Sequence, residues 1–202
     1  MPTTRVAIVI DWQNVFRSAR DAFGPGTNGN VYPLALAHRL AKDRVAGQPP
    51  GSLVGVEIHT GIPSQKQSWV TYSARRRQIS AWEASHPCVH VHPRTLAIRN
   101  GQMVEKGVDV AVAIGLVRHL LFDKDCDTAV LVSADTDLLP ALELIVAQLG
   151  PRVIEVAMWD GPYQGPASLS LAGQPIRQHK LDENFYRSIE DKTPYGHTPR
   201  DG

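Results

Sequence analysis

Hydrophobic and polar positions along the chain follow two alternating patterns. Short, mostly apolar runs rich in β-branched residues predict strands that are buried on both faces. These strands are expected over residues 6–10, 53–59, 88–92, 127–133 and 152–158. Apolar residues three and four positions apart predict helices between the strands. The helices are expected over residues 12–23, 33–44, 64–84, 104–122 and 138–149.

This alternation of strands and helices predicts the fold class. Gly150 and Pro151 end the helix at 138–149 in the order expected at a helix C-terminus. Strands that alternate with helices form βαβ units, which build parallel sheets. We therefore expect an α/β fold with a mostly parallel central sheet and helices on both faces.

The pattern weakens at residue 160. The last 43 residues contain five Gly and five Pro. We expect a weak helix over residues 181–189 and disorder from Lys192 onward. The predicted organisation is one domain over residues 1–160, followed by a Gly/Pro-rich extension over residues 161–202.

Composition excludes several classes of protein. The chain has 202 residues, of which 43% are hydrophobic and 20% charged, as in an ordinary globular protein. It contains two cysteines, too few for a disulfide framework or a four-cysteine zinc site, and this favours a reducing compartment. The N-terminus has no secretory apolar region and no stretch is long enough to span a membrane, so we expect a cytoplasmic protein.

Carboxylates follow two of the predicted strands. Asp11 ends the first, and Asp135 and Asp137 follow the strand at 127–133. The carboxyl ends of parallel strands meet at one rim. Glu105 and Asp109, in the first turn of the helix predicted over residues 104–122, are expected to point toward the same rim. Oxygen ligands suit Mg²⁺ or Mn²⁺, and two such ions can support phosphodiester hydrolysis. Crowded carboxylates also repel one another unless a cation lies among them.

Each of these acids also has a purely structural interpretation. An aspartate after a strand often caps the next helix, as Asp137 is placed to do, and the helix dipole favours Asp109. Capping does not explain Asp135 and Asp137 together. Glu105 and Asp109 are four residues apart, which favours a shared cation unless the helix begins after Glu105.

Three segments together resemble a known family. Residues 8–14 (IVIDWQN), 105–113 (EKGVDVAVA) and 131–140 (LVSADTDLLP) resemble the three sequence blocks of the NYN domain family, including its LabA-like members. That family belongs to the PIN-like nuclease superfamily, and the resemblance covers roughly residues 5–158. It implies a PIN-like three-layer sandwich and a ribonuclease that uses Mg²⁺ or Mn²⁺. The matched positions are Asp11, Asn14, Asp109, Asp135 and Asp137.

The chain departs from the family pattern without losing a carboxylate. Trp12 and Gln13 stand where the first block commonly has a glycine and another residue, and Ala134 stands where glycine is frequent. The bulk of Trp12 bears on the shape of the substrate, and Trp12 is a further candidate RNA contact.

One predicted helix is strongly basic. Lys66, Arg75, Arg76 and Arg77 lie in it, with the aromatic residues Trp69, Tyr72 and Trp82 between them. Basic and aromatic side chains together suit a nucleic-acid backbone with stacked bases, so RNA is the expected partner. The structural alternative is a solvated charged face with the aromatic residues packed inward.

Two further signals carry less weight. His90 and His92 have a spacing that can bind zinc, but no cysteine or further histidine at metal-ligand spacing accompanies them, so structural or surface roles are favoured. His59, at the end of a strand, is a candidate substrate contact. Residues 24–29 match G-x-G-x-x-G but do not directly follow a strand, so they predict a loop.

The leading hypothesis is a metal-dependent ribonuclease. The alternatives are a catalytically silent RNA-binding or regulatory module, and a phosphatase-type hydrolase with Asp11 as nucleophile. The phosphatase type usually has a second aspartate two residues after the first, where this chain has Gln13. The sequence does not specify the RNA substrate, a protein partner or an oligomeric state.

Overall fold

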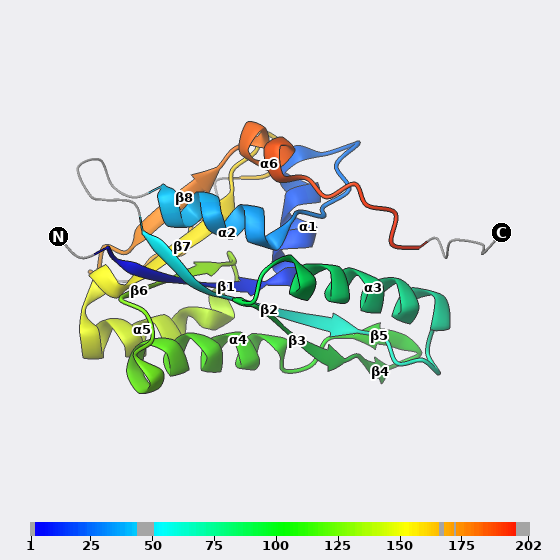
Figure 1. Ribbon diagram of the computed structural model, residues 1–202, viewed down its shortest axis with the longest axis horizontal. Coiled ribbons are helices and arrows are strands. Elements are labelled where there is room, and N and C mark those ends of the chain that lie inside the picture. The colour runs from blue at the N-terminus through cyan, green and yellow to red at the C-terminus, as the bar shows by residue number, and fades with distance from the viewer. Residues whose placement is uncertain (1–2, 44–50, 166–167, 172, 197–202) are drawn as a thin grey trace.

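A computed structural model describes residues 3–43, 51–165, 168–171 and 173–196. Its centre is a six-stranded parallel sheet with strand order β3-β2-β1-β6-β7-β8 (Figure 1). The strands are β1 (Arg5–Asp11), β2 (Ser52–Ile62), β3 (Val89–Thr95), β6 (Thr128–Val132), β7 (Ile154–Trp159) and β8 (Arg177–Leu181). This is the α/β architecture that the sequence predicted.

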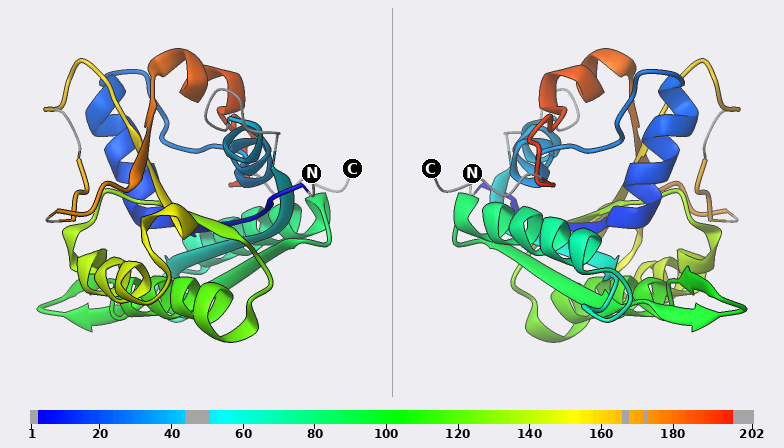
Figure 2. Two further views of the ribbon diagram at one scale, coloured as in Figure 1. Left: turned by 90° about the vertical axis from the view of Figure 1, so that its left-hand side faces the viewer. Right: turned by 90° about the vertical axis from the view of Figure 1, so that its right-hand side faces the viewer.

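Helices cover both faces of the sheet (Figure 2). One face carries α1 (Trp12–Phe23), α2 (Pro33–Lys42), α3 (Trp69–Ser85) and α6 (Glu183–Ile189). The other face carries α4 (Val108–Val117) and α5 (Leu139–Leu149). The sheet therefore separates two apolar cores, as expected for a three-layer sandwich.

The central strand β1 sets the direction in which the functional side chains point. Ile8 and Ile10 are fully buried in the core under α1 and α2, whereas Ala7 and Val9 are fully buried in the core under α4 and α5. Because side chains alternate along a strand, Asp11 continues the Ala7–Val9 series and projects toward the α4 side.

The segment before α4 differs from the prediction of one helix over residues 104–122. Strands β4 (Ala97–Arg99) and β5 (Gln102–Val104) form a small antiparallel hairpin, and α4 begins only at Val108. Glu105 thus precedes the helix, and the predicted repulsion within a helix between Glu105 and Asp109 does not arise. After α4 the chain continues as a π-helical turn over Arg118–Asp123.

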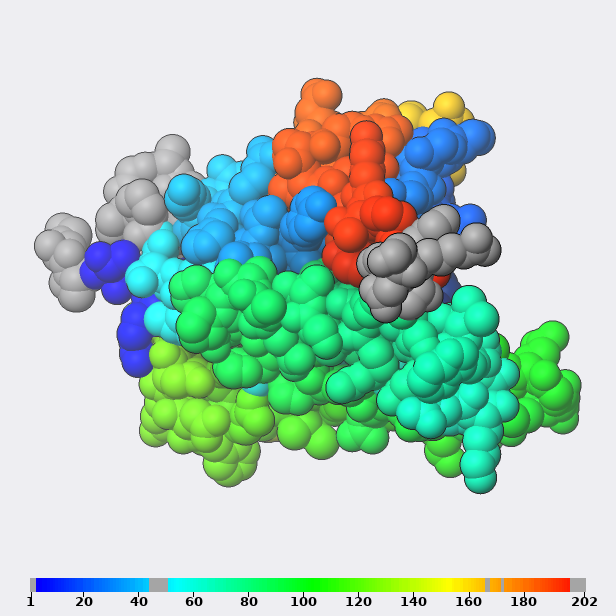
Figure 3. All heavy atoms as spheres, turned by 45° about the vertical axis from the view of Figure 1, so that its right-hand side comes forward, coloured from blue at the N-terminus to red at the C-terminus, as the bar shows by residue number. Residues whose placement is uncertain are grey.

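The C-terminal segment is part of the same sheet. Strand β8 pairs in parallel with β7, and α6, capped by the Asp182 side chain, packs into the core beside α1 and α2. The predicted boundary at residue 160 therefore does not separate an appended extension from the fold. Residues 192–196 lie along α3 (Figure 3), where Arg77 Nε donates to the Tyr195 carbonyl oxygen. The expected disorder from Lys192 is wrong for these residues, and residues 197–202 lie outside the described part.

The sequence predicted no membrane-spanning segment, and the helices of the structure can be compared with that expectation. In the described residues, no helix is both long and apolar enough to cross a lipid bilayer.

Candidate metal centre

A cavity of about 350 Å³ lies at the carboxyl ends of β1 and β6. Besides Asp21 of α1, four carboxylate residues that the sequence pointed to line it: Asp11, Glu105, Asp109 and Asp135. They come from the end of β1, the loop before α4, the first turn of α4 and the loop after β6. The structure thus brings four of the predicted site acids to one cavity, and their role in metal binding stays a prediction.

Asp11 is the most deeply placed of the four acids. Its Oδ1 accepts a hydrogen bond from the Asn14 backbone N–H at 3.2 Å, which caps α1, and its Oδ2 accepts from Ser133 Oγ at 3.2 Å. Burial, together with the nearby Glu105 and Asp135 carboxylates, raises the pKa of Asp11 to about 6, although the two hydrogen bonds lower it. The site thus disfavours a negative charge at Asp11 when no cation balances it.

The loop after β6 is held by hydrogen bonds within itself and to α1. The Asp135 N–H donates to Ser133 Oγ at 3.1 Å, and the Ala134 N–H donates to Asn14 Oδ1 at 3.0 Å. Asp135 Oδ1 accepts from the Asp137 N–H at 3.0 Å and caps the short 3₁₀ turn over Thr136–Leu138. Asp137, which was expected to cap the following helix, does not do so, because the N-cap of α5 is Leu138 and no side chain caps it.

Glu105 joins the site across the end of β2. Its Oε1 accepts from the Gly61 N–H at 2.7 Å, and burial raises its pKa. A Cβ at Gly61 would overlap the Glu105 carboxylate and the Leu96 side chain, so the close approach requires glycine there.

Asp137 does not line this cavity. Its side chain is exposed and borders a neighbouring apolar groove between α4 and α5, which Asp109 also borders. Among the described residues, the acids of the cavity form no group of three with all ligand atoms within 4.8 Å of one another. Their oxygens are therefore spaced more widely than direct ligands of one ion.

Sequence reasoning missed part of the rim. Arg17, Ser18 and Asp21 line the same cavity as Asn14. The spacing 14, 17, 18, 21 places these residues on one face of α1, so helical periodicity was the signal that could have identified them.

The candidate RNA contacts have different surroundings. Trp12 is fully buried and packs on buried Trp82 with ring centroids 4.3 Å apart, so the prediction that Trp12 contacts RNA is wrong. Trp12 is the first residue of α1 and lies on the helix face that packs against the sheet, so its side chain is part of the apolar core. Lys66 and Arg76 are exposed, as is Trp69.

The other two arginines of α3 are engaged within the protein. Arg77 bonds the C-terminal segment. Arg75 donates to Gln78 Oε1 at 2.6 Å and lies over the Phe16 ring, and it is close enough to Glu105 to lower the pKa of that carboxylate. The Arg75 side chain is therefore the part of the basic helix α3 that lies near the acidic cavity.

The fold resembles one solved structure. A Vibrio parahaemolyticus protein of unknown function matches with a TM-score of 0.58 and 18% sequence identity, over 91% of this chain and 96% of that chain. At this identity the similarity concerns the fold alone. A search of curated proteins found no match.

Comparison with protein families is more specific. The sequence pattern of the NYN domain matches residues 5–172, which includes β1, β6 and the whole acidic cavity. The match spans most of the chain and contains the three segments in which the resemblance was first seen. This chain therefore belongs to the NYN domain family.

Proposed function

We propose that the protein is a ribonuclease that hydrolyses RNA phosphodiester bonds with Mg²⁺ or Mn²⁺ bound in the acidic cavity. The observation that carries this proposal is the meeting of four carboxylates from four segments of a NYN domain in one cavity. Such a concentration of negative charge is tolerated best when a cation balances it.

The donor set fits a hard divalent ion. All four carboxylates offer oxygen, and Asn14 adds an amide, as Mg²⁺ and Mn²⁺ prefer. The raised pKa of Asp11, which follows from burial and from the neighbouring Glu105 and Asp135 carboxylates, supports a cation at this place. Because the oxygens are widely spaced, we assign Asp11, Glu105, Asp109 and Asp135 to hydrated ions that they hold partly through water.

A bound ion of this kind lowers the pKa of its water and stabilises a leaving oxygen. The chain's own residues supply the remaining functions. Asn14 is held by the Ala134 N–H through its Oδ1, which leaves its NH₂ group to orient a phosphate or a water. Arg17 at the cavity wall places a positive charge where the RNA backbone would enter.

The RNA backbone is proposed to reach the cavity along α3. Exposed Arg76, Lys66 and the exposed ring of Trp69 offer phosphate contacts and a stacking surface. Arg75 of α3, which interacts with Glu105, would then contact the phosphates closest to the acids.

Ribonuclease activity should depend on both the ion and the acids. Purified protein is expected to cleave fluorescently labelled single-stranded RNA with Mn²⁺ or Mg²⁺, and a chelator should stop it. Asp109→Asn should lower the cleavage rate by about 100-fold or more, because it removes a ligand without burying a new charge. Glu143→Gln, an exposed acid on α5, is the matched control and should keep the full rate.

Docking and chemistry can be separated in the same assay. Arg76→Ala should weaken RNA binding and reduce the salt dependence of that binding. The rate at which bound RNA is cleaved should change little. Cleavage that persists at the wild-type rate in Asp109→Asn would contradict the proposal. Metal-independent RNA binding without any cleavage would identify the silent RNA-binding module instead.

A further inference from the structure

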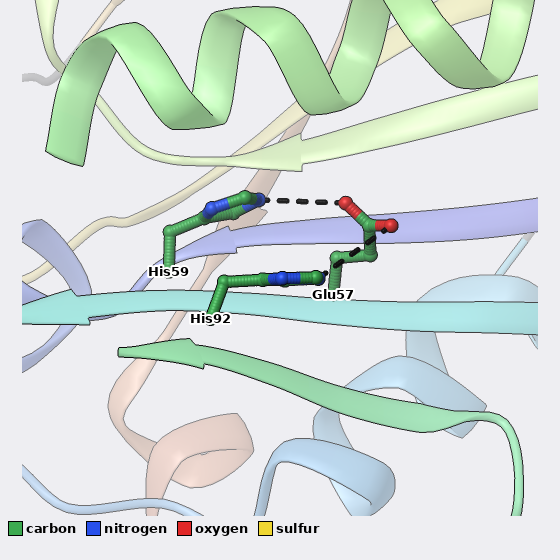
Figure 4. A group of neighbouring side chains, drawn as sticks. All are labelled: Glu57, His59 and His92. Atoms are coloured by element: carbon green, nitrogen blue, oxygen red, sulfur yellow. Dashed lines mark ion pairs between the residues drawn. The ribbon is translucent and has the colours of Figure 1, made fainter. Parts of the chain in front are cut away.

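A second polar cluster lies on the α4 side of the sheet, away from the acidic cavity. Glu57 and His59 are two residues apart on β2, and His92 is the direct neighbour of His59 on β3 (Figure 4). Their side chains rise from the sheet toward α4, and the rings of His59 and His92 stack with centroids 4.9 Å apart. Glu57 and His59 are almost completely buried, whereas the His92 side chain is 41% exposed.

Several polar atoms of this cluster lack hydrogen bonds. Among the described residues, Glu57 Oε2, His92 Nε2 and both ring nitrogens of His59 are buried without a hydrogen-bond partner. Buried polar atoms in folded proteins are nearly always paired, so several orphaned atoms at one place point to a missing ligand.

The separation of His59 and Glu57 matches that of two metal ligands, and His92 lies slightly farther from the carboxylate. His59 Nε2 is 3.5 Å from Glu57 Oε2, and His92 Nε2 is 3.7 Å from Glu57 Oε1. Two ligands held roughly 2.0–2.2 Å from one tetrahedral ion are about 3.3–3.5 Å apart. A pair that is simply hydrogen-bonded is closer, as in the buried pair of His179 and Glu155, where Nε2 and Oε2 are 2.6 Å apart.

The surroundings keep the cluster in place and leave one side open. Gly115 of α4 lies over it, and a Cβ there would come within 2.9 Å of Glu57 Oε2 and 3.1 Å of His59 Nε2. Arg118 donates to Glu57 Oε1, and His119 Nε2 lies 3.3 Å from the same oxygen, whereas Glu57 Oε2 is the oxygen beside His59 Nε2. Glu57, His59 and His92 also line a surface cavity of about 550 Å³.

We infer that Glu57, His59 and His92 form a binding site for a zinc-type divalent ion, separate from the acidic cavity. Two imidazoles and one carboxylate are a borderline-soft ligand set that selects Zn²⁺ over Mg²⁺. Three protein ligands leave a fourth position facing the cavity, where water or a small donor molecule binds. This site is independent of the ribonuclease proposal.

Zinc binding is tested with untagged full-length protein, titrated with Zn²⁺ against a chromophoric chelator. Wild type should bind one Zn²⁺ at this site, and His92→Gln should lower the affinity at least tenfold. His92 is chosen because its partly exposed ring can be replaced without opening the core. His59→Gln should have at least as large an effect, with circular dichroism to confirm folding. Co²⁺ should give the visible absorption of a four-coordinate site in wild type and lose it in His92→Gln.

Two controls locate the ion. His179→Gln alters a buried histidine that is hydrogen-bonded to Glu155, and Asp109→Asn alters the acidic cavity. Both variants should bind Zn²⁺ as wild type does. Equal affinity in wild type and His92→Gln would overturn the inference, as would loss of binding in Asp109→Asn, which would place the ion in the acidic cavity.

Discussion

The Asp11 carboxylate illustrates how one residue can serve a site at the expense of the fold. It is 6% exposed, lies near two other carboxylates and has a pKa of about 6. The folded protein therefore binds this proton more tightly than the unfolded chain, in which an aspartate has a pKa of about 3.9. Stability from this group is present at low pH and is lost as the pH rises from about 4 through about 6.

Asp11→Asn should therefore stabilise the metal-free protein at neutral pH. Asparagine keeps the cap on α1 and removes the buried charge, so we expect the free energy of unfolding to increase by about 2 kcal/mol at pH 7.5. At pH 4 the gain should nearly vanish, because Asp11 is then protonated in the folded protein. Urea unfolding at the two pH values measures the difference.

Asp127→Asn serves as the opposite control. Asp127 is exposed, and Arg5 lowers its pKa, so its replacement should give no stabilisation at pH 7.5. An Asp11→Asn protein that is equally destabilised at both pH values would show that the carboxylate contributes packing or hydrogen bonding rather than electrostatic strain.

At the scale of elements, α4 connects the two proposed metal sites. Asp109 in its first turn faces the acidic cavity, and Gly115, six residues later, covers Glu57 and His59. Six residues of helix correspond to about 9 Å. A single helix thus fixes both sites against the same face of the sheet, and a displacement of α4 would affect both.

Gly115→Ala tests how closely α4 must approach. Alanine is the better helix former by about 1 kcal/mol, yet its methyl group would press on Glu57 and His59. We expect a net loss of about 1–3 kcal/mol in the free energy of unfolding, measured by chemical denaturation. Gly55→Ala is the matched control, because the nearest atom, His119 Cε1, is 3.9 Å away and the substitution should be tolerated. A Gly115→Ala protein more stable than wild type would mean that α4 does not contact the cluster.

The sequence predicted the strands that are buried on both faces, because burial on both faces leaves a continuous run of apolar residues. Strands β1 and β6 are buried on both faces and read as continuous apolar runs, so the carboxylates that follow them could be located in advance. Strand β8, at the edge of the sheet, has the polar sequence RQHKL and gave no such signal.

The cluster around Glu57 was hidden for a different reason. His59 and His92 become neighbours only through the register of β2 and β3, and no spacing along the chain reveals that register. Glu57 also lies inside a strand, where a single charged residue interrupts an apolar run and gives no sequence signal of a site. The zinc spacing of His90 and His92 was visible, but the other ligands were on the preceding strand.

At the scale of the whole molecule, the C-terminal segment completes the core. Tyr186 of α6 is fully buried, lies 5.6 Å from the Trp159 ring and 5.4 Å from the Phe23 ring, and donates its hydroxyl to Asn28 Oδ1 at 3.0 Å. These contacts join α6 to α1, β7 and the loop after α1. The chain should consequently unfold as one unit through residue 189.

Tyr186→Ala should lower the free energy of unfolding of the entire protein by about 3–5 kcal/mol, in a single transition. Tyr163→Ala, which truncates a ring that is 67% exposed, should change it by less than about 0.5 kcal/mol. Urea unfolding followed by both tryptophan fluorescence and circular dichroism measures the effect. A variant that keeps the main transition and loses only a small early phase would show that residues 177–189 fold separately.

The position of β1 between β2 and β6 affects how the chain is made. Val6–Ile10 is fully buried, yet β6 reaches its last residue only at Val132. At a synthesis rate of about 5–20 residues per second, roughly 6–24 s pass between completion of β1 and completion of β6. Throughout that interval this apolar strand has at least one open edge. A nascent chain of this protein is thus a natural client for a chaperone at the ribosome, and slow codons before residue 132 would prolong its exposure.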